Sequence, residues 1–164
     1  MKLRYARVGF VVSVLLFAGC AATVSRSETS EGAPLARQVT QSDHCGLTAP
    51  GVVYVERYDQ LERLSRLPAQ NLALDALANV DFEREHLVLV GLGQKPTGGY
   101  GVTLDSSAIN DDVLELAVNV RQPSAGAMVT QALTTPCAVI AVTPDAWDRL
   151  QVSGRGMETL TRKR

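Results

Sequence analysis

Acid–base chemistry needs a carboxylate or an imidazole within reach of a substrate, and one short stretch of this sequence offers both. Glu83, Glu85 and His86 lie together just before an apolar run. The same residues are typical of a solvated polar turn that leads into a strand, and we favour this interpretation. His44 is the only other histidine, so no serine or cysteine has an evident histidine partner. Gly-x-Ser-x-Gly and His-Glu-x-x-His motifs are absent from the sequence. We therefore predict that the protein is not an enzyme, with an unrecognised hydrolase as a remote alternative.

A glycine-rich stretch offers different chemistry. Residues 91–99 contain four glycines and one proline, between the apolar runs 87–90 and 102–104. Glycine loops that hold phosphates carry either G-x-G-x-x-G or G-x-x-x-x-G-K-[ST] and open a helix. Here Lys95 follows Gln94 rather than glycine, the third glycine of the dinucleotide motif is missing, and no helix is expected next. We therefore expect no nucleotide and no other cofactor.

The glycine-rich loop is nevertheless constrained in shape. Glycine adopts backbone angles that other residues avoid, and proline fixes its own φ. Because rigid loops on sheets are common binding sites, we expect a partner-binding loop here. Its residues are Gln94, Lys95, Pro96, Thr97, Gly98, Gly99 and Tyr100. A purely structural explanation carries somewhat more weight. The glycines would permit a tight connection, the threonine hydroxyl would bond its own loop, and the tyrosine ring would be buried.

The N-terminus has the pattern of an exported protein. Lys2, Arg4 and Arg7 precede an apolar stretch over residues 8–18, too short to span a bilayer and typical of a signal peptide. The sequence Leu16-Phe17-Ala18-Gly19-Cys20 then resembles the bacterial lipobox, which implies that Cys20 is acylated and becomes the first mature residue. An ordinary secretory signal is the alternative. Ala21, directly after the cysteine, favours sorting of the lipoprotein to the outer membrane, where it would lie on the periplasmic face.

Two further cysteines are expected to pair. With Cys20 lipidated, Cys45 and Cys137 are left as an even pair in an oxidising compartment. A disulfide between them would close a loop of about 90 residues and stabilise the fold by about 4–5 kcal/mol. Two buried free thiols are the alternative. The histidines and cysteines show no zinc-ligand spacing, so no metal site is expected.

The composition after the leader argues against nucleic acid as a partner. Without the three basic residues of the leader, 13 basic and 17 acidic residues remain, a net charge near −4. No basic stripe of the kind that binds nucleic acid is visible. The membrane is expected to be reached through the lipid anchor.

The later chain is dominated by strand signals separated by turns. One short helix is expected after a capping-box pattern at Asp59 and Glu62, with Pro68 ending it, and residues 72–77 are expected to form a further helical turn. Polar turns are expected at residues 106–112 and 122–127. The expected strands are residues 51–56, 87–90, 102–104, 113–120, 128–133, 137–142 and 149–152.

This order predicts an α+β fold in a single compact domain. The sheet should be mostly antiparallel, sandwich-like or barrel-like, with one short early helix. We divide the chain into a signal peptide (residues 1–19), a lipidated flexible tether (20–44), the domain (45–155) and a C-terminal tail (156–164).

Three segments resemble one known family. The chain is similar to the C-terminal domain of the PrcB family in these segments, which are Asp81-Phe82, Gly93-Gln94-Lys95-Pro96-Thr97-Gly98-Gly99-Tyr100, and Thr135-Pro136 before the apolar run 137–142. The resemblance covers roughly residues 52–152. It implies a strand, a Gly-x-x-Pro-Thr-Gly-Gly-Tyr loop, another strand and a later apolar strand. The family takes its name from a lipoprotein subunit of a secreted protease complex, so the resemblance implies an accessory role beside a protease.

The same loop is also similar in outline to a loop of chagasin-like inhibitors of papain-type proteases. Those inhibitors insert a Pro-Thr-Thr-Gly-Tyr-like loop into the protease cleft, whereas Gly98 stands here in place of the second threonine. Two functions are therefore expected. The first is a non-catalytic module that binds or stabilises another envelope protein, such as a member of a protease complex. The second is a protease inhibitor that uses residues 94–100 as a wedge.

Overall fold

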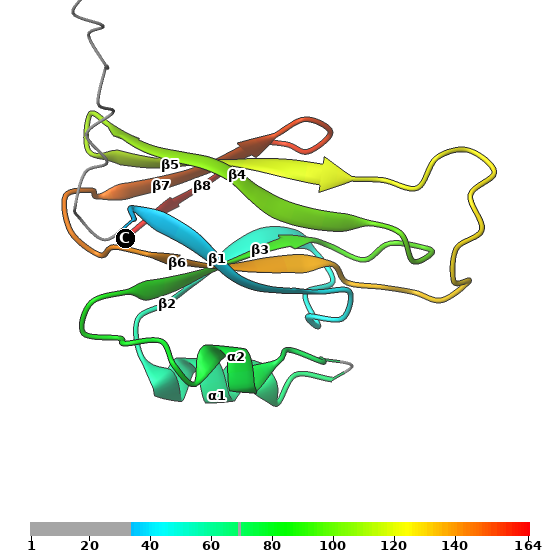
Figure 1. The fold of residues 1–164 in the computed structure, drawn as a ribbon, viewed down its shortest axis with the longest axis horizontal. Helices are drawn as coiled ribbons and strands as arrows, with labels where there is room; N and C mark the ends of the chain where they lie inside the picture. The colour runs from blue at the N-terminus through cyan, green and yellow to red at the C-terminus, as the bar shows by residue number, and fades with distance from the viewer. Residues whose placement is uncertain (1–33, 69) are drawn as a thin grey trace, which may run out of the picture. The chain divides into compact units, whose positions relative to one another are not determined.

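The computed structural model describes residues 34–68 and 70–164 (Figure 1). The predicted signal peptide and the predicted acylation site Cys20 lie outside the described residues. Within them, two four-stranded sheets face each other, and two short helices cover the outer face of one sheet (Figure 1). The predicted α+β class, with mostly antiparallel sheet and little helix, is therefore confirmed.

The first sheet contains the most apolar strands. Its strands are β1 (Ala36–Ser42), β2 (Pro50–Val55), β3 (His86–Leu92) and β6 (Cys137–Val142), in the order β1-β6-β3-β2 with every pair antiparallel. The two central strands, β3 and β6, are apolar at nearly every position because both of their faces are covered. Alternate side chains point to opposite faces. Val88 and Ile140 thus enter the core between the sheets, whereas Leu89 and Val139 pack towards the helices.

The second sheet has one covered and one exposed face. Its strands are β4 (Gly101–Asn110), β5 (Val113–Arg121), β7 (Arg149–Gly154) and β8 (Leu160–Lys163), in the order β4-β5-β7-β8. Strands β5 and β7 are parallel. Parallel neighbours need a long crossover connection, and here the connection includes β6 of the first sheet. Because only one face of this sheet is covered, side chains along β5 alternate between buried and more exposed positions. Leu114, Leu116 and Val118 are buried, and their sequence neighbours are more exposed.

The helices are α1 (Tyr58–Ser65) and α2 (Leu74–Leu77). Their buried leucines, Leu61 and Leu77, pack into the core beneath the first sheet. The predicted capping box is wrong: α1 begins one residue before Asp59, its N-cap is Arg57, and no side chain caps it. Asp59 instead accepts a hydrogen bond of 2.8 Å from Arg63 one turn later. None of the described helices is long and apolar enough to cross a membrane.

The structure differs from the sequence-based predictions at four segments. Strand β1 lies inside the predicted tether 20–44, and β8 lies inside the predicted tail 156–164. Strand β4 also continues to Asn110, so the predicted turn at 106–112 is confined to its last two residues. The predicted strand over residues 128–133 is wrong, because that segment is irregular and belongs to a long projecting connection between β5 and β6 (Figure 1).

Candidate functional site

The glycine-rich loop, residues 93–100, connects β3 of the first sheet to β4 of the second. Backbone hydrogen bonds tie it to the β5–β6 connection. The Lys95 N–H donates to the Thr134 carbonyl at 2.8 Å, and the Thr134 N–H donates back to the Lys95 carbonyl at 3.0 Å. The Gly98 N–H donates to the Thr130 carbonyl at 2.9 Å, and the Thr134 hydroxyl donates to the Thr97 carbonyl at 2.9 Å. The loop is therefore hydrogen-bonded to Thr130 and Thr134 of the β5–β6 connection. This agrees with the defined backbone shape that its glycines and proline predicted.

Two loop glycines are required by the backbone. Gly93 and Gly99 have φ angles of +71° and +86°, in the left-handed region that side chains disfavour. A Cβ at Gly93 would lie 2.6 Å from Pro50 Cδ, and one at Gly99 would lie 2.9 Å from Val129 Cγ1. Gly98 is buried but has no positive φ. The structural explanation therefore accounts for Gly93 and Gly99.

The other loop side chains differ in what they contact. Gln94 and Pro96 are exposed, and the half-buried Thr97 hydroxyl donates to the Gly98 carbonyl at 3.1 Å. Lys95 and Tyr100 face each other, with the ammonium nitrogen 5.6 Å from the ring centroid. At this distance the cation interacts favourably with the ring face.

Lys95 and Tyr100 also line an open pocket of about 350 Å³. Its walls come from the ends of β3, β5 and β8 and from the turn between β7 and β8. Apolar wall residues are Leu92, Val120, Met157 and Leu160, and Gln122 and Glu158 add polar groups. An apolar pocket with a few polar groups is the usual form of a recognition site. It can accept an apolar group of a ligand beside the lysine ammonium.

The sequence predicted only the loop side of this pocket. The turn residues Gly156, Met157 and Glu158 were assigned to a C-terminal tail, yet they complete the wall opposite the loop. The available sequence signal for this wall was a single apolar residue, Met157, directly after Gly154-Arg155-Gly156. Nothing local shows that β7 and β8 return beside β5, so the signal could not be used.

The residues considered for acid–base chemistry are not brought together into a catalytic group. Glu83 is exposed. Glu85 accepts two hydrogen bonds from the Arg37 guanidinium, at 2.8 and 2.5 Å. His86 is occupied elsewhere: its Nδ1 lies 2.5 Å from the Tyr54 hydroxyl. In the part of the chain that the structure describes, no group of three or more His, Cys, Asp or Glu side chains is placed to hold a metal ion.

Burial tunes the Tyr54–His86 pair. It raises the pKa of Tyr54 to about 12 and lowers the pKa of His86 below its usual 6.5. The tyrosine therefore remains protonated at neutral pH, where its hydroxyl shares a hydrogen bond with the neutral imidazole. Trp147 packs edge-on against Tyr54, and its indole N–H donates to the Thr143 carbonyl at 2.8 Å. The cluster is satisfied internally.

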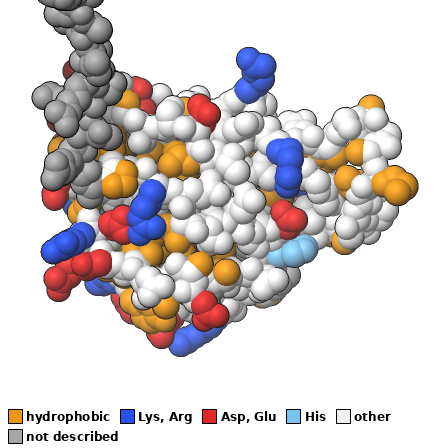
Figure 2. Space-filling model, in the orientation of Figure 1, with side chains coloured by type: hydrophobic (Ala, Val, Ile, Leu, Met, Phe, Trp, Pro, Cys, Tyr) orange, Lys and Arg blue, Asp and Glu red, His pale blue; other side chains and the backbone are white. Residues whose placement is uncertain are grey.

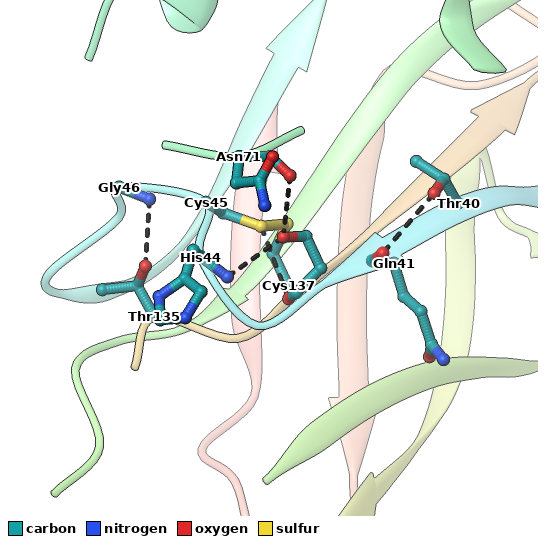
Figure 3. The surroundings of a disulfide bond; sticks show 9 residues. Thr40, Gln41, His44, Cys45, Gly46, Asn71, Thr135 and Cys137 are labelled. Carbon is teal, nitrogen blue, oxygen red and sulfur yellow. Dashed lines mark hydrogen bonds between the residues drawn. A yellow bond between two sulfur atoms is a disulfide. The ribbon is translucent and has the colours of Figure 1, made fainter. Parts of the chain in front are cut away.

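The predicted disulfide between Cys45 and Cys137 is present, with Cα atoms 6.0 Å apart (Figure 3). Both cysteines are buried. The bond joins the connection between β1 and β2 to the first residue of β6. Close by, the Gly46 N–H donates to the Thr135 hydroxyl at 3.0 Å (Figure 3). The disulfide thus fixes the segment that leads into β6, and with it the base of the β5–β6 connection.

The part of the chain that contains the glycine-rich loop and the β5–β6 connection matches a known family. Residues 87–143 match the PrcB C-terminal family model. This match confirms the resemblance predicted from the sequence, and it runs from β3 through the glycine-rich loop and β5 to β6. No curated protein and no solved structure matches the chain.

Proposed function

We propose that the chain is a non-catalytic binding module that supports another envelope protein, with a subunit of a protease complex as the leading candidate. The PrcB C-terminal match supports the association with a protease complex. The single observation that carries the binding role is the placement of Lys95 and Tyr100. Both side chains line the open pocket, while the glycines between and beside them hold the backbone. The loop thus presents two side chains to the pocket from a backbone that hydrogen bonds hold in place.

Location supports the same proposal. A signal peptide and an acylated Cys20 would hold the domain on the periplasmic face of the outer membrane, where an envelope protease complex would be within reach. The lipid would supply the membrane contact, and the domain would supply the contact to protein.

Partner capture from detergent-solubilised envelope extracts tests the proposal. A tagged chain should retain its partner, and Lys95→Ala should weaken retention at least tenfold because it removes the cation at the pocket rim. Lys163→Ala is the matched control, because it removes the same side chain from β8 away from the pocket. Thermal stability should change little in both variants, since exposed and half-exposed positions usually cost less than about 0.5 kcal/mol. Unchanged capture by Lys95→Ala would remove the pocket from the site.

A second candidate is a protease inhibitor that uses residues 94–100 as a wedge. The observation in its favour is that Gln94 and Pro96 are exposed beside a projecting connection, so two segments could enter one cleft. Against it, Gly98 is buried. The purified domain should then inhibit a papain-type protease, and Pro96→Ala should raise the inhibition constant. Absence of inhibition at high micromolar concentration would leave the accessory role alone.

A further inference from the structure

The connection between β5 and β6, residues 122–136 and called the arm here, projects from the sheets (Figure 1). It contains no ionisable side chain, although the chain as a whole has 16 basic and 17 acidic residues. Met128 is 102% exposed and Leu133 is 63% exposed. Figure 2 shows hydrophobic side chains at this far end of the face, where charged side chains are absent. Among the described residues, three large hydrophobic side chains are exposed, and two of them, Met128 and Leu133, lie on the arm.

The arm is held in place rather than left free. Its base is tied to the glycine-rich loop through the hydrogen bonds of Thr130 and Thr134 described above. Val129 packs against the backbone of Gly99, where no side chain would fit. Nearer the tip, the Ala127 N–H donates to the Ser124 carbonyl at 3.0 Å. Because the arm is already ordered, binding through it costs less conformational entropy.

We propose that the arm inserts Met128 and Leu133 into an uncharged apolar groove of a partner protein. This proposal rests on the proposed binding role and adds the surface that would anchor the complex. An arm without charges can be buried without leaving an unpaired ion, and the cores of protein interfaces are depleted of charged residues. Methionine suits the tip because its flexible, polarisable side chain adapts to irregular apolar surfaces. The groove should match the arm by lacking charge as well.

A bilayer is the less suitable occupant. Segments that lie in the membrane interface combine Trp, Phe or Leu with Lys or Arg at the headgroup level. The arm has no aromatic residue and no basic residue.

Photo-crosslinking in the full-length, exported chain tests the arm directly. A diazirine analogue of methionine is placed at position 128, at position 157 in the pocket wall, and at position 108 on the exposed part of β4 as control. We expect position 128 to crosslink to one protein, and the crosslinked partner peptide to lie in an uncharged apolar groove. Position 108 should give no product.

The purified partner then provides the quantitative test. Met128→Asp should weaken its binding to this chain at least tenfold, whereas Met128→Leu should change it less than about threefold. Ala108→Asp adds the same charge elsewhere and should leave binding unchanged. The arm's contribution should resist salt, because charged groups are absent from it. An unchanged melting temperature for Met128→Asp would show that the domain remains folded.

The outcomes separate the two proposals. A partner crosslinked from position 157 but not from 128, or bound equally by Met128→Asp, overturns the arm proposal and leaves the binding role intact. Crosslinks from 128 to phospholipid or to a second copy of this chain also overturn the arm proposal, since the occupant is then not a partner groove. Failure to crosslink any protein from any of the positions removes both.

Discussion

Tyr54 and His86 illustrate how single residues in this domain depend on their surroundings. The Tyr54 hydroxyl is hydrogen-bonded to Nδ1 of His86, and burial lowers the pKa of this histidine below 6.5. The folded state therefore favours the neutral imidazole, and the unfolded state binds more protons just below pH 6.5. Stability from this group is present above pH 6.5 and is lost as the pH falls from there towards the lower folded-state pKa.

This dependence gives a prediction at the residue scale. Between pH 7.5 and 5.5 the melting temperature of the wild type should fall, and His86→Gln should flatten that part of the profile. The physical reason is that glutamine cannot take up the proton that opposes folding. Thermal unfolding followed by circular dichroism measures both curves. His44→Gln is the matched control, and a profile that it flattens as strongly would assign the dependence to something other than His86.

Gly99 and Gly126 allow a second prediction, on the two sources of glycine dependence. Both have a positive φ, +86° and +79°, but a Cβ at Gly99 would meet Val129 and Pro123, whereas one at Gly126 would meet nothing within 4 Å. Gly126→Ala should cost about 1 kcal/mol of unfolding free energy from backbone strain alone. Gly99→Ala should cost about 2–4 kcal/mol because it adds a clash. Denaturant unfolding gives both values, and equal losses would contradict the packing seen around Gly99.

At the scale of elements, the sequence predicted strands where burial imposes a pattern. The apolar run 137–142 and the alternating run 113–120 became β6 and β5, because their side chains have covered faces to fill. The edge strand β1 was missed, since its Ala-Arg-Gln-Val-Thr-Gln-Ser sequence joins the sheet mainly through backbone hydrogen bonds with β6. Strand β8 was missed for a similar reason. The opposite error occurred at 128–133, where strand-forming residues have no neighbouring strand to pair with.

One wall of the candidate site could likewise be predicted from the sequence, and the opposite wall could not. The loop 94–100 was found because glycine and proline mark a constrained backbone locally. The opposite wall at Met157 and Leu160 was not found, because it depends on β7 pairing in parallel with β5 after the chain has crossed to the other sheet. Such a non-local arrangement leaves no local signal.

The disulfide gives a prediction for the elements that it joins. Cys45 precedes β2 and Cys137 begins β6, at a sequence separation of 92 residues. Replacing both by Ala should lower the unfolding free energy by about 4 kcal/mol, because the unfolded chain regains the freedom of that loop. Comparison of urea unfolding for the oxidised wild type and the double variant measures it. Mass spectrometry of the oxidised protein should also find neither cysteine alkylatable, and two free thiols would contradict the bond.

At the scale of the whole molecule, the proposed contacts lie on connected segments. The arm is bonded to the loop, the loop lines the pocket, and the disulfide fixes the segment where the arm enters β6. This arrangement suits a module that holds a partner, and its effect on a protease would come through binding.

The last prediction concerns how the whole chain is held in the envelope. Cys20 ends an apolar stretch of signal-peptide length after Ala18-Gly19, and we expect it to be acylated. Cys20→Ser should release the protein into the soluble periplasmic fraction or leave an unprocessed precursor, because a serine cannot carry the thioether-linked lipid. Membrane fractionation and intact-mass measurement distinguish these products. Ser27→Ala, a change of similar size in the following segment, should mature and fractionate like the wild type. If Cys20→Ser did so too, the chain would be secreted without an anchor, and the proposed position on the outer membrane would be wrong.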